Sequence, residues 1–167
     1  LEINNLGYAA DRDAYRPQLV AYLKQQETHL CGNCRRRIDT NPLRVLDCKV
    51  PECRTATEAA PRLADCLSDK ARGHFSSVLA GLDAVRIPYS LNHRLVRGLD
   101  YYGLTTFEVT STSLGAQNAV GAGGRYDSLV ETLGGPVTPA VGFAVGLDRK
   151  STRLNSSHIP LSRMPSS

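Results

Sequence analysis

The chain has 167 residues, of which 41% are hydrophobic and 22% are charged. This composition is typical of one globular domain, or one and a fraction, and it excludes a collagen-like, mucin-like or wholly disordered protein. The longest apolar runs are shorter than the roughly 18–20 residues that cross a bilayer, and no basic-then-apolar leader opens the chain. We therefore expect a cytoplasmic protein with no membrane partner.

The positive charge is spread unevenly along the chain. Twenty basic and 16 acidic residues give a net charge of +4, and three of the basic residues lie in the acid-free segment 150–167. That segment is rich in serine and has no apolar periodicity, which predicts a disordered and non-native tail. Because basicity is informative only on a folded face, the charge is weak support for nucleic-acid binding.

The first half of the chain has mostly helical patterns. Residues 1–4 alternate apolar and polar side chains, which predicts a short strand that ends at Gly7. Apolar residues at spacings of three and four predict helices over residues 11–26, 57–67 and 69–82. Asp11 is a candidate cap for the first of these, and Pro42 should end a helix that contains RRRIDTN.

The second half is rich in strand patterns. Strands are predicted over 87–91 and over 105–110, where β-branched residues alternate with polar ones. Residues 128–133 predict a short helix that ends at Gly134-Gly135, and residues 139–146 are consistent with a buried strand. The sequence thus indicates an α+β fold in which 1–7 and 85–149 share a sheet and 8–84 form a helical insertion.

Four of the five cysteines have the spacing of metal ligands. Cys31 and Cys34 are separated by two residues, and Cys48 and Cys53 by four, which resembles a four-thiolate zinc site. Free thiols in a helical module are the alternative, and disulfides are not expected without a secretory signal. Cys66 fits a helix core. Isolated histidines are seldom ligands, and this half holds two of them, His29 and His74.

The segment LVRGLDYY (95–102) combines a permanent cation with two phenols. Arg97 suits two-point binding of a carboxylate or a phosphate, and Gly98 leaves space beside it. On an extended backbone Tyr101 and Tyr102 would point to opposite faces, one towards a pocket and one into the core. A turn on which Arg97 pairs with Asp100, with both tyrosines in the core, fits these residues equally well.

Two glycine-rich segments follow. GAGGRYD (121–127) lacks the Lys-Ser/Thr of a P-loop and the spacing of a dinucleotide fingerprint. It predicts either a glycine pocket floor beside Tyr126 or a plain tight turn before a helix, with Arg125 and Asp127 as a structural pair. GFAVGLDR (142–149) places Arg149 after a small-residue strand, where it would bind a nucleotide phosphate or pair with Asp148.

Four segments, in this order and spacing, resemble the histidyl-tRNA synthetase family. The segments are LVRGLDYY (95–102), TTFEV (105–109), GAGGRYDSLVETLGG (121–135) and TPAVGFAVGLDR (138–149). The first is similar to the family's histidine-specific arginine signature, the second block to its other histidine-specific signature, and the last to motif 3 of class II synthetases. NPLRVLDCK (41–49) resembles the insertion domain of bacterial members. The resemblance implies part of a class II catalytic domain, built on an antiparallel sheet, with a mostly helical insertion.

The resemblance also implies roles in the activation of L-histidine by ATP with Mg²⁺. Arg97 would bridge the histidine carboxylate and the α-phosphate of ATP. Tyr101 and Tyr102 would line the histidine pocket, with Tyr102 facing the imidazole, and Tyr126 would help to close it. Arg149 would bind the γ-phosphate. Such a reaction needs no protein nucleophile, because positioning and charge neutralisation are sufficient.

The sequence departs from the family pattern at several places. Asp148 stands where Glu is usual, and Gly103-Leu104 occupy a place where Thr-Gly is common. Motif 1, motif 2 and the anticodon-binding domain are not found in residues 1–149, and the first residue is Leu1. We therefore expect an internal fragment of a homodimeric parent, inactive alone towards tRNA(His).

Two other functions stay open. The synthetase-like regulatory subunit of ATP phosphoribosyltransferase, in histidine biosynthesis, shares much of the second and third blocks, whereas LVRGLDYY and NPLRVLDCK favour the ligase. A zinc-containing module that contacts RNA, over residues 28–66, rests on the cysteines alone.

Overall fold

The computed structural model describes residues 1–96, 101–111 and 119–146. The described elements combine a single sheet with helices that come mainly from the first half of the chain, so the predicted α+β class is confirmed. In chain order they are β1 (Glu2–Asn5), α1 (Ala9–Gln25), η1 (Glu27–His29), α2 (Gly32–Thr40), α3 (Leu43–Leu46), α4 (Pro51–Ala56), η2 (Leu63–Cys66), α5 (Asp69–Ala84), β2 (Ser90–Leu91), β3 (Gly103–Thr110), β4 (Ala119–Arg125), α6 (Leu129–Thr132) and β5 (Val141–Val145).

The five described strands form one sheet in the order β2-β1-β3-β4-β5. β1 pairs with β2 in parallel, and the other three neighbouring pairs are antiparallel. The expected antiparallel sheet is therefore present, with one short parallel pair in addition. Because β1 lies between two strands from the second half of the chain, the helical stretch leaves the sheet and returns to it.

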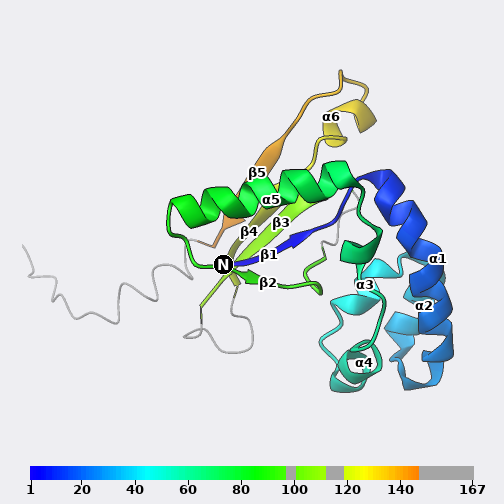
Figure 1. Ribbon diagram of the computed structural model, residues 1–167. Coiled ribbons are helices and arrows are strands. Elements are labelled where there is room, and N and C mark those ends of the chain that lie inside the picture. The colour runs from blue at the N-terminus through cyan, green and yellow to red at the C-terminus, as the bar shows by residue number, and fades with distance from the viewer. Residues whose placement is uncertain (97–100, 112–118, 147–167) are drawn as a thin grey trace, which may run out of the picture.

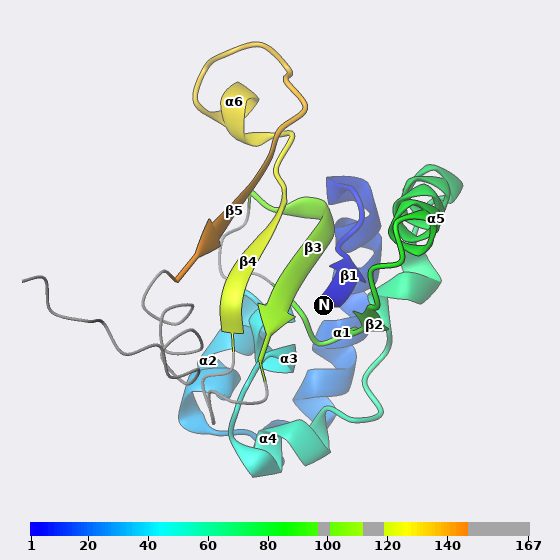
Figure 2. The same ribbon diagram turned by 90° about the vertical axis from the view of Figure 1, so that its left-hand side faces the viewer.

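The helices occupy two places around this sheet. Helices α1–α4 gather at one side of it, and α5 returns alone across one sheet face (Figures 1 and 2). In α1, Tyr15, Leu19 and Leu23 recur every fourth residue and are fully buried, as expected for the inner stripe of an amphipathic helix. The same core continues to Val96 and Leu104, so it joins the helical group to the sheet.

Asp11 connects the start of α1 to the start of α5. Its carboxylate accepts the backbone N–H of Tyr8 at 2.8 Å and that of Ser68 at 2.9 Å. The Ser68 hydroxyl in turn accepts the N–H of Ala71 at 3.4 Å and caps α5. The carboxylate predicted to cap one helix thus satisfies donors at two helix starts that are distant in sequence.

The prediction of one helix over residues 57–67 is wrong. α4 ends at Ala56, and only the short helix η2 forms later, over Leu63–Cys66. Pro61 has no N–H for a helical hydrogen bond and restricts the residue before it, so the pattern cannot continue as one helix. The Thr57 hydroxyl donates to the carbonyl of Cys53 at 2.8 Å as the chain leaves α4.

β3 contains a residue in an uncommon backbone conformation. Leu104 has a φ of +50° and is buried, and the register with β4 is irregular between Gly103 and Thr106. The Leu104 N–H donates to Gly7 O at 2.9 Å, and the Leu6 N–H donates to Leu104 O at 2.7 Å. The resemblance stated above implies that glycine is common at this position, and glycine adopts positive φ without a steric penalty.

The strand predicted as buried over 139–146 forms, but it is exposed. β5 is an edge strand, and its Val141, Phe143 and Val145 side chains are 72%, 75% and 46% exposed. A run of small apolar residues has the same pattern in a buried strand and in an edge strand that nothing covers, so the sequence did not distinguish the two.

Candidate functional site

Glycines of two adjacent strands leave part of one sheet face without side chains. Gly124 of β4 pairs directly with Gly142 of β5 and with Thr106 of β3, and residues that pair in this way share a face. A Cβ at Gly124 would lie 2.9 Å from the Tyr102 ring, and a Cβ at Gly142 would overlap the Tyr126 hydroxyl. The GAGG run is therefore a strand, and Gly124 of this run, together with Gly142 of β5, leaves room for two phenol rings.

The predicted site tyrosines lie together on this glycine floor. Tyr101 and Tyr102 stack with ring centroids 4.9 Å apart, and Tyr126 meets both edge-on at 5.9 and 6.0 Å. The prediction that Tyr101 and Tyr102 point to opposite faces is wrong, because Tyr101 lies in a turn and β3 begins only at Gly103. Offset and edge-on ring contacts of this kind are favourable for aromatic side chains.

The chain before Arg97 is held on both sides. The Asn4 amide of β1 donates to Leu95 O at 3.1 Å. The Arg94 guanidinium donates to Arg54 O at 2.8 Å, and also to the Thr57 hydroxyl. The sheet and the end of α4 therefore fix the segment that leads to position 97.

Two of the predicted site residues lie outside the described residues. These are Arg97 and Arg149, together with Asp100 and Asp148, the acids that the alternative interpretations paired with them. Val96, directly before the first gap, and Tyr102, the second residue after it, line the same polar cavity of about 220 Å³. The described chain on either side of position 97 thus converges on one hollow beside the tyrosine cluster.

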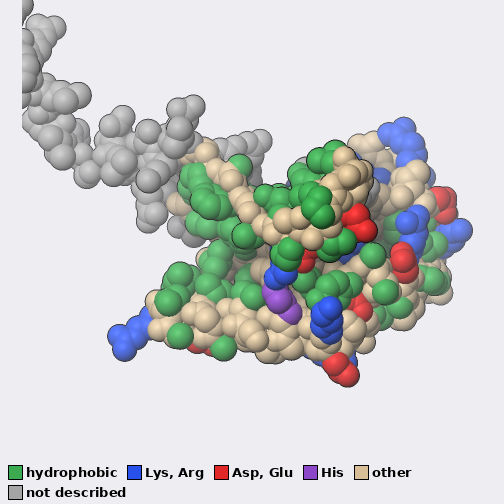
Figure 3. Space-filling model, turned by 90° about the horizontal axis from the view of Figure 1, so that it is seen from above, with side chains coloured by type: hydrophobic (Ala, Val, Ile, Leu, Met, Phe, Trp, Pro, Cys, Tyr) green, Lys and Arg blue, Asp and Glu red, His purple; other side chains and the backbone are tan. Residues whose placement is uncertain are grey.

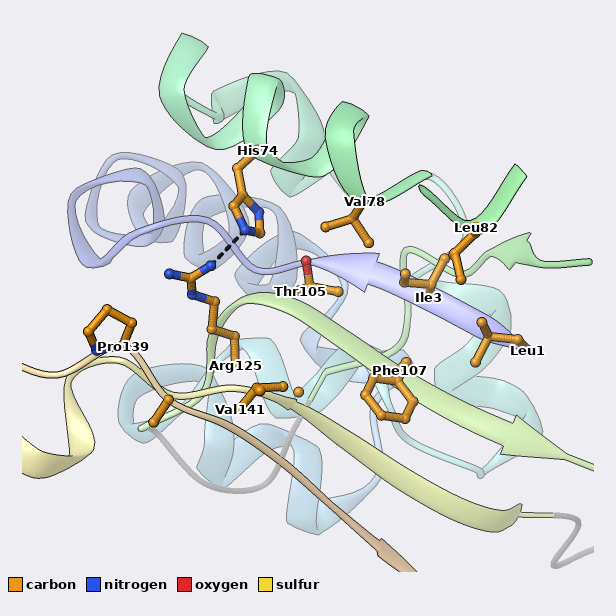
Figure 4. A pocket seen from close by; sticks show the side chains of 12 residues that line it. Leu1, Ile3, His74, Val78, Leu82, Thr105, Phe107, Arg125, Pro139 and Val141 are labelled. Carbon is orange, nitrogen blue, oxygen red and sulfur yellow. Dashed lines mark hydrogen bonds between the residues drawn. The ribbon is translucent and has the colours of Figure 1, made fainter. Parts of the chain in front are cut away.

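The opposite sheet face carries a separate cleft. It has a volume of about 520 Å³ and lies between α5 and strands β1, β3 and β4, with Val78 and Leu82 of α5 facing Ile3 and Phe107 of the sheet (Figure 4). Hydrophobic side chains gather on both sides of the hollow when the molecule is seen from above (Figure 3). This cleft is predominantly apolar, in contrast to the cavity beside Tyr102.

A charged group closes one end of the cleft. Arg125 Nε donates to both carboxylate oxygens of Asp127 at 2.8 Å, which confirms the predicted structural pair. Arg125 Nη1 lies 2.7 Å from His74 Nε2. Burial, with the charge of Arg125 in addition, lowers the pKa of His74 from its ordinary value, so the neutral ring accepts from Arg125 and carries its proton on Nδ1.

The sequence did not predict the contact between His74 and Arg125, because an isolated histidine on a helix has no partner within its own motif. Among the described side chains, His74 Nδ1 and Thr105 Oγ1 are the buried polar atoms without a hydrogen-bond partner. Both residues line the apolar cleft. The only sequence signal was the position of His74 on the same α5 stripe as Val78 and Leu82, which repeats every fourth residue.

The four cysteines predicted as ligands come together in the helical group. The sulfur atoms of Cys31, Cys34, Cys48 and Cys53 all lie within 4.8 Å of one another, and all are free thiols. A hydrogen bond from the Cys34 backbone holds the pKa of the Cys31 thiol at about 7, whereas burial raises the pKa of the Cys34 thiol. Cys66, the fifth cysteine, is not a member of this group.

No helix within the described ranges is long and apolar enough to cross a membrane.

Comparisons with known proteins agree with the arrangement of these segments. The family model described as histidyl-tRNA synthetase matches residues 19–149. The histidine–tRNA ligase of Trichlorobacter lovleyi is 56% identical over 149 residues, which are 89% of this chain and 36% of that protein. The ligase of Desulfatibacillum aliphaticivorans is 51% identical over 154 residues, which are 92% of this chain and 37% of that protein.

A solved structure shows the same fold. The apo histidyl-tRNA synthetase of S. aureus superposes with a TM-score of 0.70 at 33% identity, over 96% of this chain and 39% of that one. The chain thus spans a little over a third of the length of these relatives. The matched region contains the glycine floor and its tyrosines, and the chain belongs to the histidyl-tRNA synthetase family.

Proposed function

We propose that this chain contributes the histidine pocket and part of the ATP site of a histidine–tRNA ligase. The observation that supports this most strongly is the cluster of Tyr101, Tyr102 and Tyr126 on the glycine floor. Three half-buried phenols around a strip of bare backbone provide flat walls and hydroxyl groups for a small polar ring such as imidazole. The family relationship supports histidine as that ligand.

In this proposal Arg97 and Arg149 neutralise the charge of the reaction. Arg97 bridges the histidine carboxylate and the α-phosphate of ATP, and Arg149 binds the γ-phosphate. A carboxylate oxygen attacks the α-phosphorus, the bond to the bridging oxygen breaks, and pyrophosphate leaves. Both reactants are anionic, so a fixed guanidinium between them lowers their mutual repulsion and orients the attack.

The tyrosines select the amino acid. Tyr102 faces the imidazole, Tyr101 packs against Tyr102, and Tyr126 closes the pocket from β4. ATP enters with Mg²⁺, and a ribose hydroxyl of tRNA(His) then attacks the carbonyl of histidyl-adenylate and releases AMP. The functional protein is proposed to be a cytoplasmic homodimer, and this chain alone is expected to lack the groups for the whole reaction.

A chimeric enzyme tests the proposal. Residues 1–149 replace the matching segment of the Trichlorobacter lovleyi ligase, to which they are 56% identical, and histidine-dependent ATP–pyrophosphate exchange is measured. We expect the chimera to exchange with histidine, and Arg97→Ala to reduce the rate by about 10²–10³-fold or more, as for other removed charge-stabilising groups.

Matched tyrosine variants test the pocket. Tyr102→Phe should raise the KM for histidine by roughly 3–10-fold, because one hydrogen bond is lost. Tyr89→Phe removes a hydroxyl that lies outside the cluster and bonds to Asp83, so it should leave the KM unchanged. Near-normal exchange by Arg97→Ala would contradict the mechanism, and no exchange by the unmodified chimera would favour the regulatory-subunit alternative.

A further inference from the structure

We propose that Cys31, Cys34, Cys48 and Cys53 bind one zinc ion that fastens three helices of the insertion together. The four sulfur atoms lie within 4.8 Å of one another. A Zn–S bond of about 2.3 Å places the sulfurs of a tetrahedral site about 3.8 Å apart, so small side-chain rotations bring all four onto one ion.

The backbone places these thiols where negative charge is favoured. Cys31 is the N-cap residue of the nine-residue helix α2, and Cys34 lies in the first turn of that helix. Exposed N–H groups at a helix start stabilise thiolates. The Cys31 N–H also donates to Cys53 Sγ at 3.1 Å, so the two halves of the site are already joined.

The burial of the four cysteines suits a zinc–thiolate centre. Basic residues directly follow three of them (Arg35, Lys49 and Arg54), acidic residues directly precede two (Asp47 and Glu52), and Lys49 bonds to Asp47 at 2.7 Å, so the charges along the chain largely balance. Cys34 and Cys53 are fully buried, whereas Cys31 and Cys48 are half-buried. The four thiols lie next to one another at the edge of the core, and one metal ion can bind all four.

The geometry favours a single ion over an iron–sulfur cluster or disulfides. In a cubane cluster each thiolate binds a different iron atom, which holds the sulfurs farther apart than one tetrahedral ion does. The same four sulfurs within one small group give no reason to divide them into two pairs. The order of the ligands along the chain links the start of α2, the turn after α3 and the start of α4.

Metal analysis of the full 167-residue chain tests the site. The protein is purified under reducing conditions without chelator, and zinc is measured by inductively coupled plasma mass spectrometry. We expect about one zinc per chain in the wild type. Cys48→Ser should lower the zinc content about ten-fold or more, and Cys66→Ser, which changes the cysteine outside the cluster, should leave it unchanged.

Cobalt reports the ligand set if the serine variant folds poorly. Replacing zinc by Co²⁺ should give the intense thiolate charge-transfer and visible bands of a tetrahedral four-sulfur site. Cys48→His should bind cobalt again with weaker charge transfer, since one thiolate is replaced by imidazole. Less than about a tenth of a zinc per chain in the wild type, equal zinc loss in Cys66→Ser, or two disulfides found by alkylation and mass spectrometry would each overturn the proposal.

Discussion

At the scale of single residues, Leu104 is the clearest point of conflict between local preference and fold. Its φ of +50° is a conformation that costs an L-residue roughly 1–2 kcal/mol. Two backbone hydrogen bonds, to Gly7 and from Leu6, hold it there, and its buried side chain contributes to the core that joins the helices to the sheet. The packing of the Leu104 side chain offsets the strain of its backbone, and glycine at this position would have neither the packing nor the strain.

A pair of substitutions separates those two effects. Leu104→Gly and Leu104→Ala both remove the packing, but only Ala keeps the strained conformation, so Leu104→Gly should be the more stable by about 1 kcal/mol. The free energy of unfolding from urea titration measures the difference. Thr106→Gly and Thr106→Ala, two residues along the strand, should show the usual order, with the Ala variant the more stable. If the Ala variant is also the more stable at position 104, strain at that residue is excluded.

Contacts between residues close in sequence were more predictable than contacts that depend on the fold. The Arg125–Asp127 pair follows from two opposite charges two residues apart, and it is present. The stacking of Tyr101 on Tyr102 was not foreseen, because it depends on a turn that ends where β3 begins. The contact of His74 was missed because its partner Arg125 is distant in sequence, and only the fold brings the two side chains together.

At the scale of elements, the strand β4 shows why a glycine run is ambiguous. Periodicity detects a strand from alternating side chains, and GAGG has none to alternate. The structure gives the reason for the glycines: a Cβ at Gly124 would lie 2.8 Å from Thr105 O and 2.9 Å from the Tyr102 ring. Elements with strong periodicity, such as α5 and β3, were by contrast predicted with nearly correct bounds.

Two glycine-to-alanine changes test this explanation of β4. Gly124→Ala should lower the free energy of unfolding by about 1–3 kcal/mol and weaken the near-ultraviolet circular dichroism of the tyrosines, which dominate because the chain has no Trp. A Cβ added at Gly81 in α5 would meet no atom within 4 Å. Gly81→Ala should therefore raise the free energy of unfolding by about 0.5–1 kcal/mol. An unchanged tyrosine signal in Gly124→Ala would show that the floor does not position the rings.

At the scale of the whole molecule, the two faces of the sheet are used differently. One carries the glycine floor with its tyrosines, and the other carries Phe107 and the cleft below α5. α5 covers only part of that second face, so β5 and the turn before it present apolar side chains to solvent, among them Leu133 and Val137 at 79% and 72% exposure. Sequence patterns indicated that these segments are apolar, but they could not indicate how far one helix would cover them.

The uncovered strand predicts self-association. Among the described strands β5 is at the edge of the sheet, with an exposed Phe143 at its centre, and an apolar edge strand is a template for pairing with another copy. Phe143→Lys should therefore increase the monomer fraction at micromolar concentration, measured by size-exclusion chromatography with light scattering. Val85→Lys adds the same charge at an exposed site on the end of α5 and should have little effect. Equal gains from both variants would assign the change to net charge, whereas a gain from Phe143→Lys alone locates the association at the edge of the sheet.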